Sequence, residues 1–426
     1  MKLKGGLSLP ELPAFFLSVC ALRFITDIKC VIFSSNVLNF HLVKSQIDSM
    51  IRERKDFSGE LSGRIKLAKE ELRNKSGNWE ELARKVESSK TSWLVAGIYS
   101  PLDKTFPLPV RPQSYTVVSS DGSQIFPDRH EALPCYLINI STITLGYGER
   151  AGAKLDSKPL LFYRDEDRFT TWGGKKIPVD NEVISLKRAL MEFERILEIV
   201  KSNKHEGDTI ALSDGTLILW RLEVTPPDFR DTIINPFLSI FEEFKNLRVP
   251  VAGYISFPGS TDVINALRVG LCPERVSYCN QCPYTELPEL PCAPIEGITD
   301  RFLFSMVLRP GEASPVFKSS SKILESYGDH HIYFFYINIG EEIARVEIPK
   351  WVSEDSELLE LVHTLIFDQA KKGKGYPVAI AEAHEQAVVK AKDRDFFFTL
   401  IREAMVKSDF AVSVSRKGLS KRISGV

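Results

Sequence analysis

Two apolar segments that each run into Ser-Asp-Gly constrain the fold more than any other feature of the chain. The first reads YTVVSSDGSQ at 115–124 and the second reads TIALSDGTLILW at 209–220. Runs of β-forming residues that stop at a turn signal predict strands. We therefore expect Asp121 and Asp214 just beyond two strand ends, with Gly122 letting the backbone turn and approach a ligand.

The segments around these motifs predict the fold class. Alternating strands follow Asp121, then a strong helix at 184–202, the Asp214 strand, an amphipathic helix at 234–247 and a buried strand at 249–258. This order indicates an α/β fold with a mixed sheet flanked by helices. Each Asp-Gly pair alone is also typical of a plain turn, whereas two strand-end carboxylates in one domain could meet on one metal ion.

Length and composition are typical of a folded protein, and the net charge gives no sign of a nucleic-acid partner. The chain has 426 residues, of which 43% are hydrophobic and 26% charged, and its net charge is −1. These values are typical of a globular protein with a sizeable core, and any DNA-binding surface must be local. Seven cysteines in a chain of this length do not suggest a secreted disulfide scaffold, so we expect a cytoplasmic protein.

The N-terminal apolar run is too short and too charged to span a membrane, because Arg23, Asp27 and Lys29 interrupt it. We expect an added, poorly ordered extension and not a targeting segment. We predict an extension at 1–36, a helical arm at 37–95, a main domain at 96–410 and a basic tail at 411–426. Ser-Gly pairs are expected to break the helices of the arm, and the arm could serve dimerisation.

Four cysteines fall within the loop 272–292 of the main domain. Cys272, Cys279, Cys282 and Cys292 are spaced C-x6-C-x2-C-x9-C, with prolines beside three of them. Such a set suits tetrahedral zinc or an iron–sulfur cluster in a structural role, and four reduced cysteines in an insertion loop are the alternative.

Near the C-terminus, GYPVAIAEAH at 375–384 presents Tyr376 in a turn and His384 on a long helix. The following residues do not form a zinc-protease motif, because Val388 stands where the second histidine is needed. No P-loop and no G-x-S-x-G occurs in the sequence, which disfavours nucleotide hydrolysis and serine-esterase chemistry.

The helix at 184–202 offers two acidic residues for a site with the aspartates. Its core stripe consists of Leu186, Leu190, Phe193, Leu197 and Val200. Periodicity slightly favours Glu194, which flanks this stripe, over Glu192 on the outer face.

Taken together, these motifs resemble the NurA family of nucleases over roughly residues 95 to 405. The matching segments are Asp121-Gly-Ser, Arg188 to Glu192, Ser213-Asp-Gly-Thr-Leu217, Gly253-Tyr-Ile-Ser256, Asp300-Arg301 before Phe304, and Gly375 to His384. The chain has Gly311-Glu-Ala-Ser314 where family members often carry Gly-Glu-Arg-Ser, and the cysteine loop is not a general family feature.

The resemblance implies a ribonuclease H-like core that cleaves DNA with manganese. It also implies a toroidal homodimer that works with the hexameric ATPase HerA in resecting double-strand breaks, as a 5′–3′ exonuclease and single-strand endonuclease. Asp121, Glu192 and Asp214 would be the acidic metal ligands, and Tyr376 and His384 would complete the site, His384 as a further ligand or a proton-transfer group. The resemblance thus prefers Glu192 to Glu194.

The residue types suit that chemistry, because carboxylates are hard ligands for Mg²⁺ or Mn²⁺ and an imidazole biases a site toward Mn²⁺. DNA phosphates would be read by nearby lysines and arginines, in a salt-dependent way. The candidates are Arg111, Arg188, Lys374, Lys390, Lys392 and Arg394. Two other functions stay open: a non-catalytic adaptor of a DNA translocase with a zinc-stabilised contact loop, and a ribonuclease H-like enzyme acting on RNA.

Overall fold

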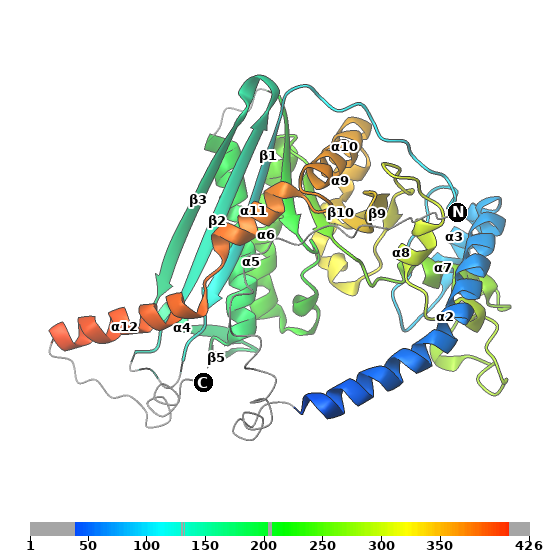
Figure 1. Cartoon of the computed structure of the whole chain (residues 1–426), viewed down its shortest axis with the longest axis horizontal. Coiled ribbons are helices and arrows are strands. Elements are labelled where there is room, and N and C mark those ends of the chain that lie inside the picture. The colour runs from blue at the N-terminus through cyan, green and yellow to red at the C-terminus, as the bar shows by residue number, and fades with distance from the viewer. Residues whose placement is uncertain (1–38, 129–130, 132, 203–206, 409–426) are drawn as a thin grey trace, which may run out of the picture. The chain divides into compact units, whose positions relative to one another are not determined.

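A computed structural model describes residues 39–128, 131, 133–202 and 207–408 (Figure 1). The predicted extension at 1–36 and basic tail at 411–426 lie outside these ranges. The chain divides into two compact units, 1–60 and 61–426. Within the described ranges, no helix is long and apolar enough to cross a membrane.

Helix α2 (Phe40–Ser76) begins the described chain and α3 (Trp79–Ser88) follows it. The predicted break at Ser58-Gly59 is wrong, since α2 runs through it and ends only before Gly77. A glycine inside a helix costs only about 1 kcal/mol relative to alanine, which helical neighbours on both sides can offset. In the larger unit, Leu72 and Leu82 are buried in a core shared with helices α7 and α8.

One eight-stranded sheet forms the centre of the larger unit. Its strands are β1 (Tyr115–Ile125), β2 (Tyr136–Tyr147), β3 (Gly152–Phe162), β6 (Asp208–Asp214), β7 (Val251–Ile255), β8 (Phe317–Lys318), β9 (Ile332–Asn338) and β10 (Ile343–Pro349). They lie in the order β3-β2-β1-β6-β7-β10-β9-β8. β1, β2 and β3 are antiparallel, whereas β6 runs parallel to β1 and β7 parallel to β6. The predicted mixed sheet is confirmed.

Helices cover both faces of this sheet. α5 (Asn181–Ser202) and α6 (Pro227–Asn246) pack on one face, and α10 (Ser356–Lys372) and α11 (Val378–Ala387) pack on the other. Further helices are α4 (Asp165–Arg168), α7 (Asp262–Leu271), α8 (Asp300–Ser305), α9 (Lys350–Ser353) and α12 (Ala391–Lys407), and β4 (Phe169–Trp172) pairs with β5 (Lys175–Pro178) in a separate hairpin. Since neighbouring strand residues point to opposite faces, Val118 packs with α5 and α6 while Val117 packs with α10 and α11. Figure 1 shows α11 crossing β1 and β2.

Two sequence predictions near the site are wrong. β1 does not end at Asp121 but continues to Ile125, with Asp121 paired opposite Ser141 of β2. β2 pairs with β1 along its whole length, so the strand continues through Ser-Asp-Gly-Ser without a turn. On the side that β6 no longer covers, Gly122 N donates to Asp121 Oδ1 at 2.7 Å. The long helix predicted to carry His384 also breaks, between α11 and α12. β6, in contrast, ends at Asp214 as predicted.

Candidate active site

Strand register brings the two predicted aspartates to the same level of the sheet. β1 and β6 pair in parallel up to Ser119 opposite Leu212. Two positions farther on, the same register matches Asp121 with Asp214. β6 leaves the sheet there through Gly215, whose φ of +81° is a left-handed conformation that glycine adopts without strain. Asp121 lies in a paired strand and Asp214 at a strand end.

Gly122 allows helix α5 to approach β1 at this level. A Cβ atom at Gly122 would lie 2.8 Å from Cγ of Arg188, 2.8 Å from Oε1 of Glu192 and 2.9 Å from Cδ1 of Ile140. A side chain at this position would displace the side chains of Arg188, Glu192 and Ile140. The glycine predicted to serve a turn therefore makes room for a glutamate.

Glu192, and not Glu194, faces this position. The side chain of Glu192 is 14% exposed, whereas Glu194 points to solvent. Helical periodicity favoured Glu194, which does not face this position, because α5 packs against other residues on two of its sides. The predicted stripe, with Phe193 and Leu197, belongs to the core shared with α6, while Ile184 packs with residues of β2.

Glu192 is an electrostatically strained group. Nε of Arg188 lies 3.2 Å from its Oε1 as an ion pair, and Nη1 of Arg188 donates to the Gly122 carbonyl at 2.7 Å. Within the described structure, Glu192 Oε1 and Arg188 Nε are nevertheless buried without a hydrogen-bond partner. Burial raises the pKa of Glu192 to about 8 against the charge of Arg188, and the negative charges of Asp121 and Asp214 also raise it.

His384 reaches Asp121 from the opposite face of the sheet. Its Nδ1 lies 2.9 Å from Oδ2 of Asp121, and its side chain is 60% exposed. Helix α11 is held in place by strand side chains, since Ser141 Oγ donates to the Ala383 carbonyl at 2.6 Å and Asn139 Nδ2 donates to the α11 C-terminus at 3.0 Å. The structure thus brings His384 to the predicted site.

Tyr376 completes the group through Asp214. Its hydroxyl donates to Oδ1 of Asp214 at 2.6 Å, and its ring lies edge-on to Tyr254 with centroids 5.5 Å apart. Burial and the bond to Asp214 raise the pKa of Tyr376 far above its ordinary range. Tyr376 therefore stays a neutral hydrogen-bond donor that orients one carboxylate.

The donor set suits a hard divalent cation. Three carboxylates and an imidazole converge from β1, α5, β6 and α11, and each carboxylate now faces a protein partner: His384, Arg188 or Tyr376. Among the described residues, no three His, Cys, Asp or Glu side chains are arranged to hold a metal ion as they stand. Apart from the ion pair with Arg188, the buried Oε1 of Glu192 has no hydrogen-bond partner, and a bound cation would give it a ligand contact.

The predicted DNA-contacting residues are in different situations. Arg188 is engaged by Glu192 and Gly122. Arg394 forms an ion pair with Asp128 at 3.2 Å, while Lys374 and Lys390 are exposed.

Glu347 of β10 is a residue that sequence reasoning missed. It is 1% exposed, and its Oε2 accepts hydrogen bonds from Thr216 Oγ1 at 2.7 Å and Leu217 N at 2.9 Å. Its other oxygen pairs with Arg345 at 3.1 Å. Glu347 therefore fixes the loop that directly follows Asp214. The sequence did offer a signal for Glu347: Arg345 and Glu347 stand two positions apart in an otherwise apolar strand, and buried charges are usually paired.

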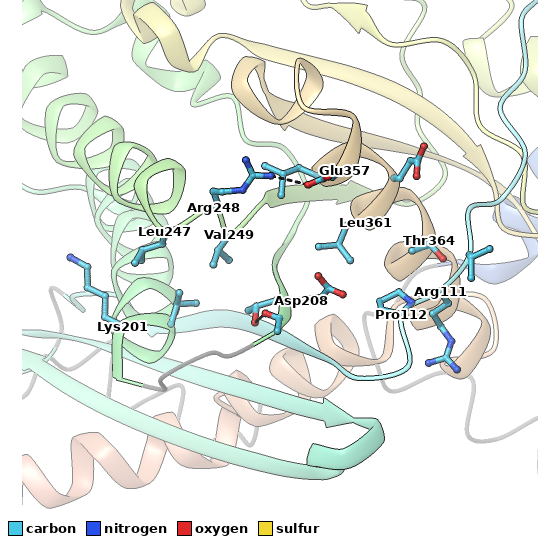
Figure 2. A pocket seen from close by; sticks show the side chains of 16 residues that line it. Arg111, Pro112, Lys201, Asp208, Leu247, Arg248, Val249, Glu357, Leu361 and Thr364 are labelled. Atoms are coloured by element: carbon cyan, nitrogen blue, oxygen red, sulfur yellow. Dashed lines mark hydrogen bonds and ion pairs between the residues drawn. The ribbon is translucent and has the colours of Figure 1, made fainter.

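A cavity of about 680 Å³ lies at the other end of β6 (Figure 2). Its lining includes Asp208 at the start of β6 and Arg111, which is thereby separated from the acidic group by roughly the 20 Å length of that strand. Arg248 forms an ion pair there with Glu357 at 3.2 Å, and both signs of charge line the wall. This cavity is not part of the acidic site.

The four loop cysteines also come together. Cys272, Cys279, Cys282 and Cys292 line one cavity of about 40 Å³ with Trp93 and Arg268. All four are free thiols of intermediate exposure. Burial raises the pKa of Cys279, and the three other thiols raise it as well.

A family model described as "NurA domain" matches residues 115–389. No curated protein matches the chain in sequence. Among solved structures, the catalytic domain of human Endonuclease V aligns with 76% of this chain and 95% of its own length, at 10% identity and a TM-score of 0.28. Endonuclease V of Ciona intestinalis, in complex with an inosine-containing 24mer DNA, aligns with 44% and 63%, at 14% identity and a TM-score of 0.17. Likenesses this weak carry no inference.

Proposed function

The chain belongs to the NurA family, and from that premise we propose that it is a metal-dependent DNA nuclease that hydrolyses phosphodiester bonds. The observation that carries the proposal is the convergence of Asp121, Glu192 and Asp214 from three separate elements at one level of the sheet. A protein that only bridges other proteins needs no such group of carboxylates.

Asp121, Glu192, Asp214 and His384 would hold the metal, with Mn²⁺ preferred over Mg²⁺ because of the imidazole. A bound divalent ion supplies an activated water and neutralises charge on the phosphate oxygens. Tyr376 keeps Asp214 oriented through its hydroxyl. His384, exposed beside Asp121, is placed to ligate or to transfer a proton.

Arg188 has two roles in this proposal. In the metal-free protein it compensates Glu192, whose pKa would otherwise rise further. With a cation bound by the carboxylates, Arg188 would lose that ion pair and could contact a phosphate. Lys374 and Lys390, both exposed, would extend the phosphate contacts.

The finer features of the proposal come from the family resemblance. The antiparallel β1-β2-β3 meander continued by parallel β6 and β7 supports a ribonuclease H-like core. The lack of a P-loop in the sequence supports dependence on a separate motor such as a HerA-like hexameric ATPase. We also propose a homodimer, action in double-strand break resection as a 5′–3′ exonuclease and single-strand endonuclease, and a cytoplasmic location.

The test is cleavage of end-labelled single- and double-stranded DNA, and of RNA, with Mn²⁺, Mg²⁺ or EDTA. Glu192→Gln is compared with Glu194→Gln, a matched change two residues along the same helix. We expect Mn²⁺-dependent DNA cleavage that falls about 10³-fold in Glu192→Gln, because a metal site contributes several kcal/mol to the barrier. Glu194→Gln should cleave like wild type.

Three results would contradict the proposal. Equal activity in Glu192→Gln and wild type would remove Glu192 from the site. Preferential cleavage of RNA would establish the ribonuclease alternative. No cleavage by folded, Mn²⁺-supplied wild type, with its ATPase present, would favour the adaptor.

A further inference from the structure

We propose that the loop 272–292 is a structural zinc site in which the thiolates of Cys272, Cys279, Cys282 and Cys292 bind one Zn²⁺. The four side chains line a single small cavity, although the loop that carries them has almost no regular structure. This site is separate from the acidic group and does not depend on the proposed nuclease activity.

Each cysteine stands at the end of a helical element, so its backbone position is defined. Cys272 directly follows α7, and Cys292 directly precedes the 3₁₀ turn Ala293–Ile295. Cys279 begins a second 3₁₀ turn and Cys282 follows that turn, which forms the C-x2-C knuckle. A knuckle joined by two more cysteines is the ligand pattern of four-coordinate structural zinc.

The donor atoms narrow the choice of metal. Thiolates are soft ligands that favour zinc or iron–sulfur clusters over Mn²⁺ and Mg²⁺. Four thiolates, two of them in a C-x2-C knuckle, form the ligand set of four-coordinate structural zinc, and on that ground we assign zinc to this loop.

Nearby cations would offset the charge of the site. Four thiolates around Zn²⁺ leave two negative charges, which need compensation in a partly buried place. Nη2 of Arg268 lies 3.9 Å from Sγ of Cys292, and its Nε donates to the carbonyl of the same residue at 3.3 Å. Lys85 of α3 donates to the Cys272 carbonyl.

Metal binding must draw the thiols inward, because no three of them hold an ion as they stand in the described loop. Zinc–sulfur bonds are about 2.3 Å long, and rotation about each Cα–Cβ bond can bring the sulfurs closer. The loop is also tied to the segment after α3, since Lys90 N donates to Ser277 O at 2.8 Å and Cys279 N donates to Lys90 O at 3.1 Å. Zinc would therefore stabilise this junction.

The experiment measures the metal content of the full chain, purified without chelators, by elemental mass spectrometry. We expect about one zinc per chain in wild type and less than about a tenth in Cys279→Ser/Cys282→Ser. Two controls should keep their zinc: Cys135→Ala, which removes a described cysteine outside the loop, and Asp121→Asn/Asp214→Asn. Hydrogen exchange should rise at 79–90 and 272–292 in the zinc-free variant and stay unchanged in β6.

A second measurement on wild type covers the case in which the double variant does not fold. Titration with a mercurial thiol reagent should release one zinc as the four loop thiols react. Several outcomes would overturn the proposal: wild type without zinc, zinc retained by the double variant, iron with acid-labile sulfide, or a native disulfide in the loop. Zinc lost from Asp121→Asn/Asp214→Asn would assign the ion to the acidic group instead.

Discussion

The acidic site and the cysteine loop, the two metal sites that we propose, bring their side chains together in opposite ways. The carboxylates come from positions as far apart as 121 and 214 and are set by strand register and helix packing. The thiols all come from the single loop 272–292, so they are already neighbours in the sequence. The carboxylates come together only when the whole sheet is folded. The thiols would be held together by the metal that we propose for the loop.

This difference decides what damages each site. A site on rigid elements is sensitive to the packing beneath it, because helix α5 cannot move without moving Glu192. The proposed loop site would be sensitive to loss of its metal, because short 3₁₀ turns and a few backbone hydrogen bonds hold the loop without it.

The largest expected effect is that of Gly122→Ala. The new methyl group would lie within 2.9 Å of side-chain atoms of Arg188, Glu192 and Ile140, so these side chains must be displaced. We expect the free energy of unfolding to fall by about 3 kcal/mol, the upper end for overpacking, with loss of nuclease activity and no change in zinc content. Denaturant unfolding and elemental analysis measure the two quantities.

The matched control for that change is Gly63→Ala in α2, where no atom lies within 4 Å of the added Cβ. It should stabilise the protein by at most about 1 kcal/mol. If Gly122→Ala unfolds like wild type and keeps its activity, the acidic site does not depend on the close packing of α5 against Gly122.

A smaller effect is expected from pH on the metal-free protein. Burial raises the pKa of Glu192 from 4.5 to about 8, so in that window the folded state holds a proton that the unfolded state has lost. Stability must then fall as pH rises through the window. Relative to Glu192→Gln, wild type should lose about 2 kcal/mol between roughly pH 5.5 and 7.5 in EDTA.

Thermal or denaturant unfolding of both proteins at the two pH values gives this difference directly. Mn²⁺ should abolish it, since a bound cation favours the ionised carboxylate. Parallel curves for wild type and Glu192→Gln in EDTA would show that Glu192 is ionised in the folded protein, which contradicts a raised pKa.

The smallest effect is expected for Tyr376→Phe, which removes the hydroxyl that orients Asp214. Loss of such an outer contact typically costs 10- to 100-fold, and we expect a fall in kcat of about 10-fold. Tyr254→Phe is the control, because its hydroxyl bonds to Glu342 at 3.1 Å and not to Asp214. An equal effect of the two changes would assign the loss to the aromatic pair.

Sequence alone predicted the parts of the fold that depend on local pattern. The strand that ends at Asp214 and the helix over 184–202 follow from apolar residues at the spacing of a strand or a helix. The continuation of β1 past Asp121 could not be predicted, since it depends on a partner strand some 20 residues away. Local turn signals are overridden when a full-length ladder is available.

The same limit applies to the site. Periodicity favoured Glu194 because it identifies one packed face, and α5 has two. Gly122 makes room for Glu192 of α5, a residue about 70 positions later in the chain, and local sequence does not reveal such a contact. The cysteine loop, in contrast, was visible from spacing, since its ligands are neighbours in sequence.

The most direct test of the central claim is calorimetric titration of the chelator-treated protein with Mn²⁺. Wild type and Cys279→Ser/Cys282→Ser should bind Mn²⁺ alike, while Asp121→Asn and Asp214→Asn should each weaken binding by at least about tenfold. Mn²⁺ binding that is unchanged in both aspartate variants, or absent from folded wild type, would contradict the assignment of this carboxylate group as the metal site of the enzyme.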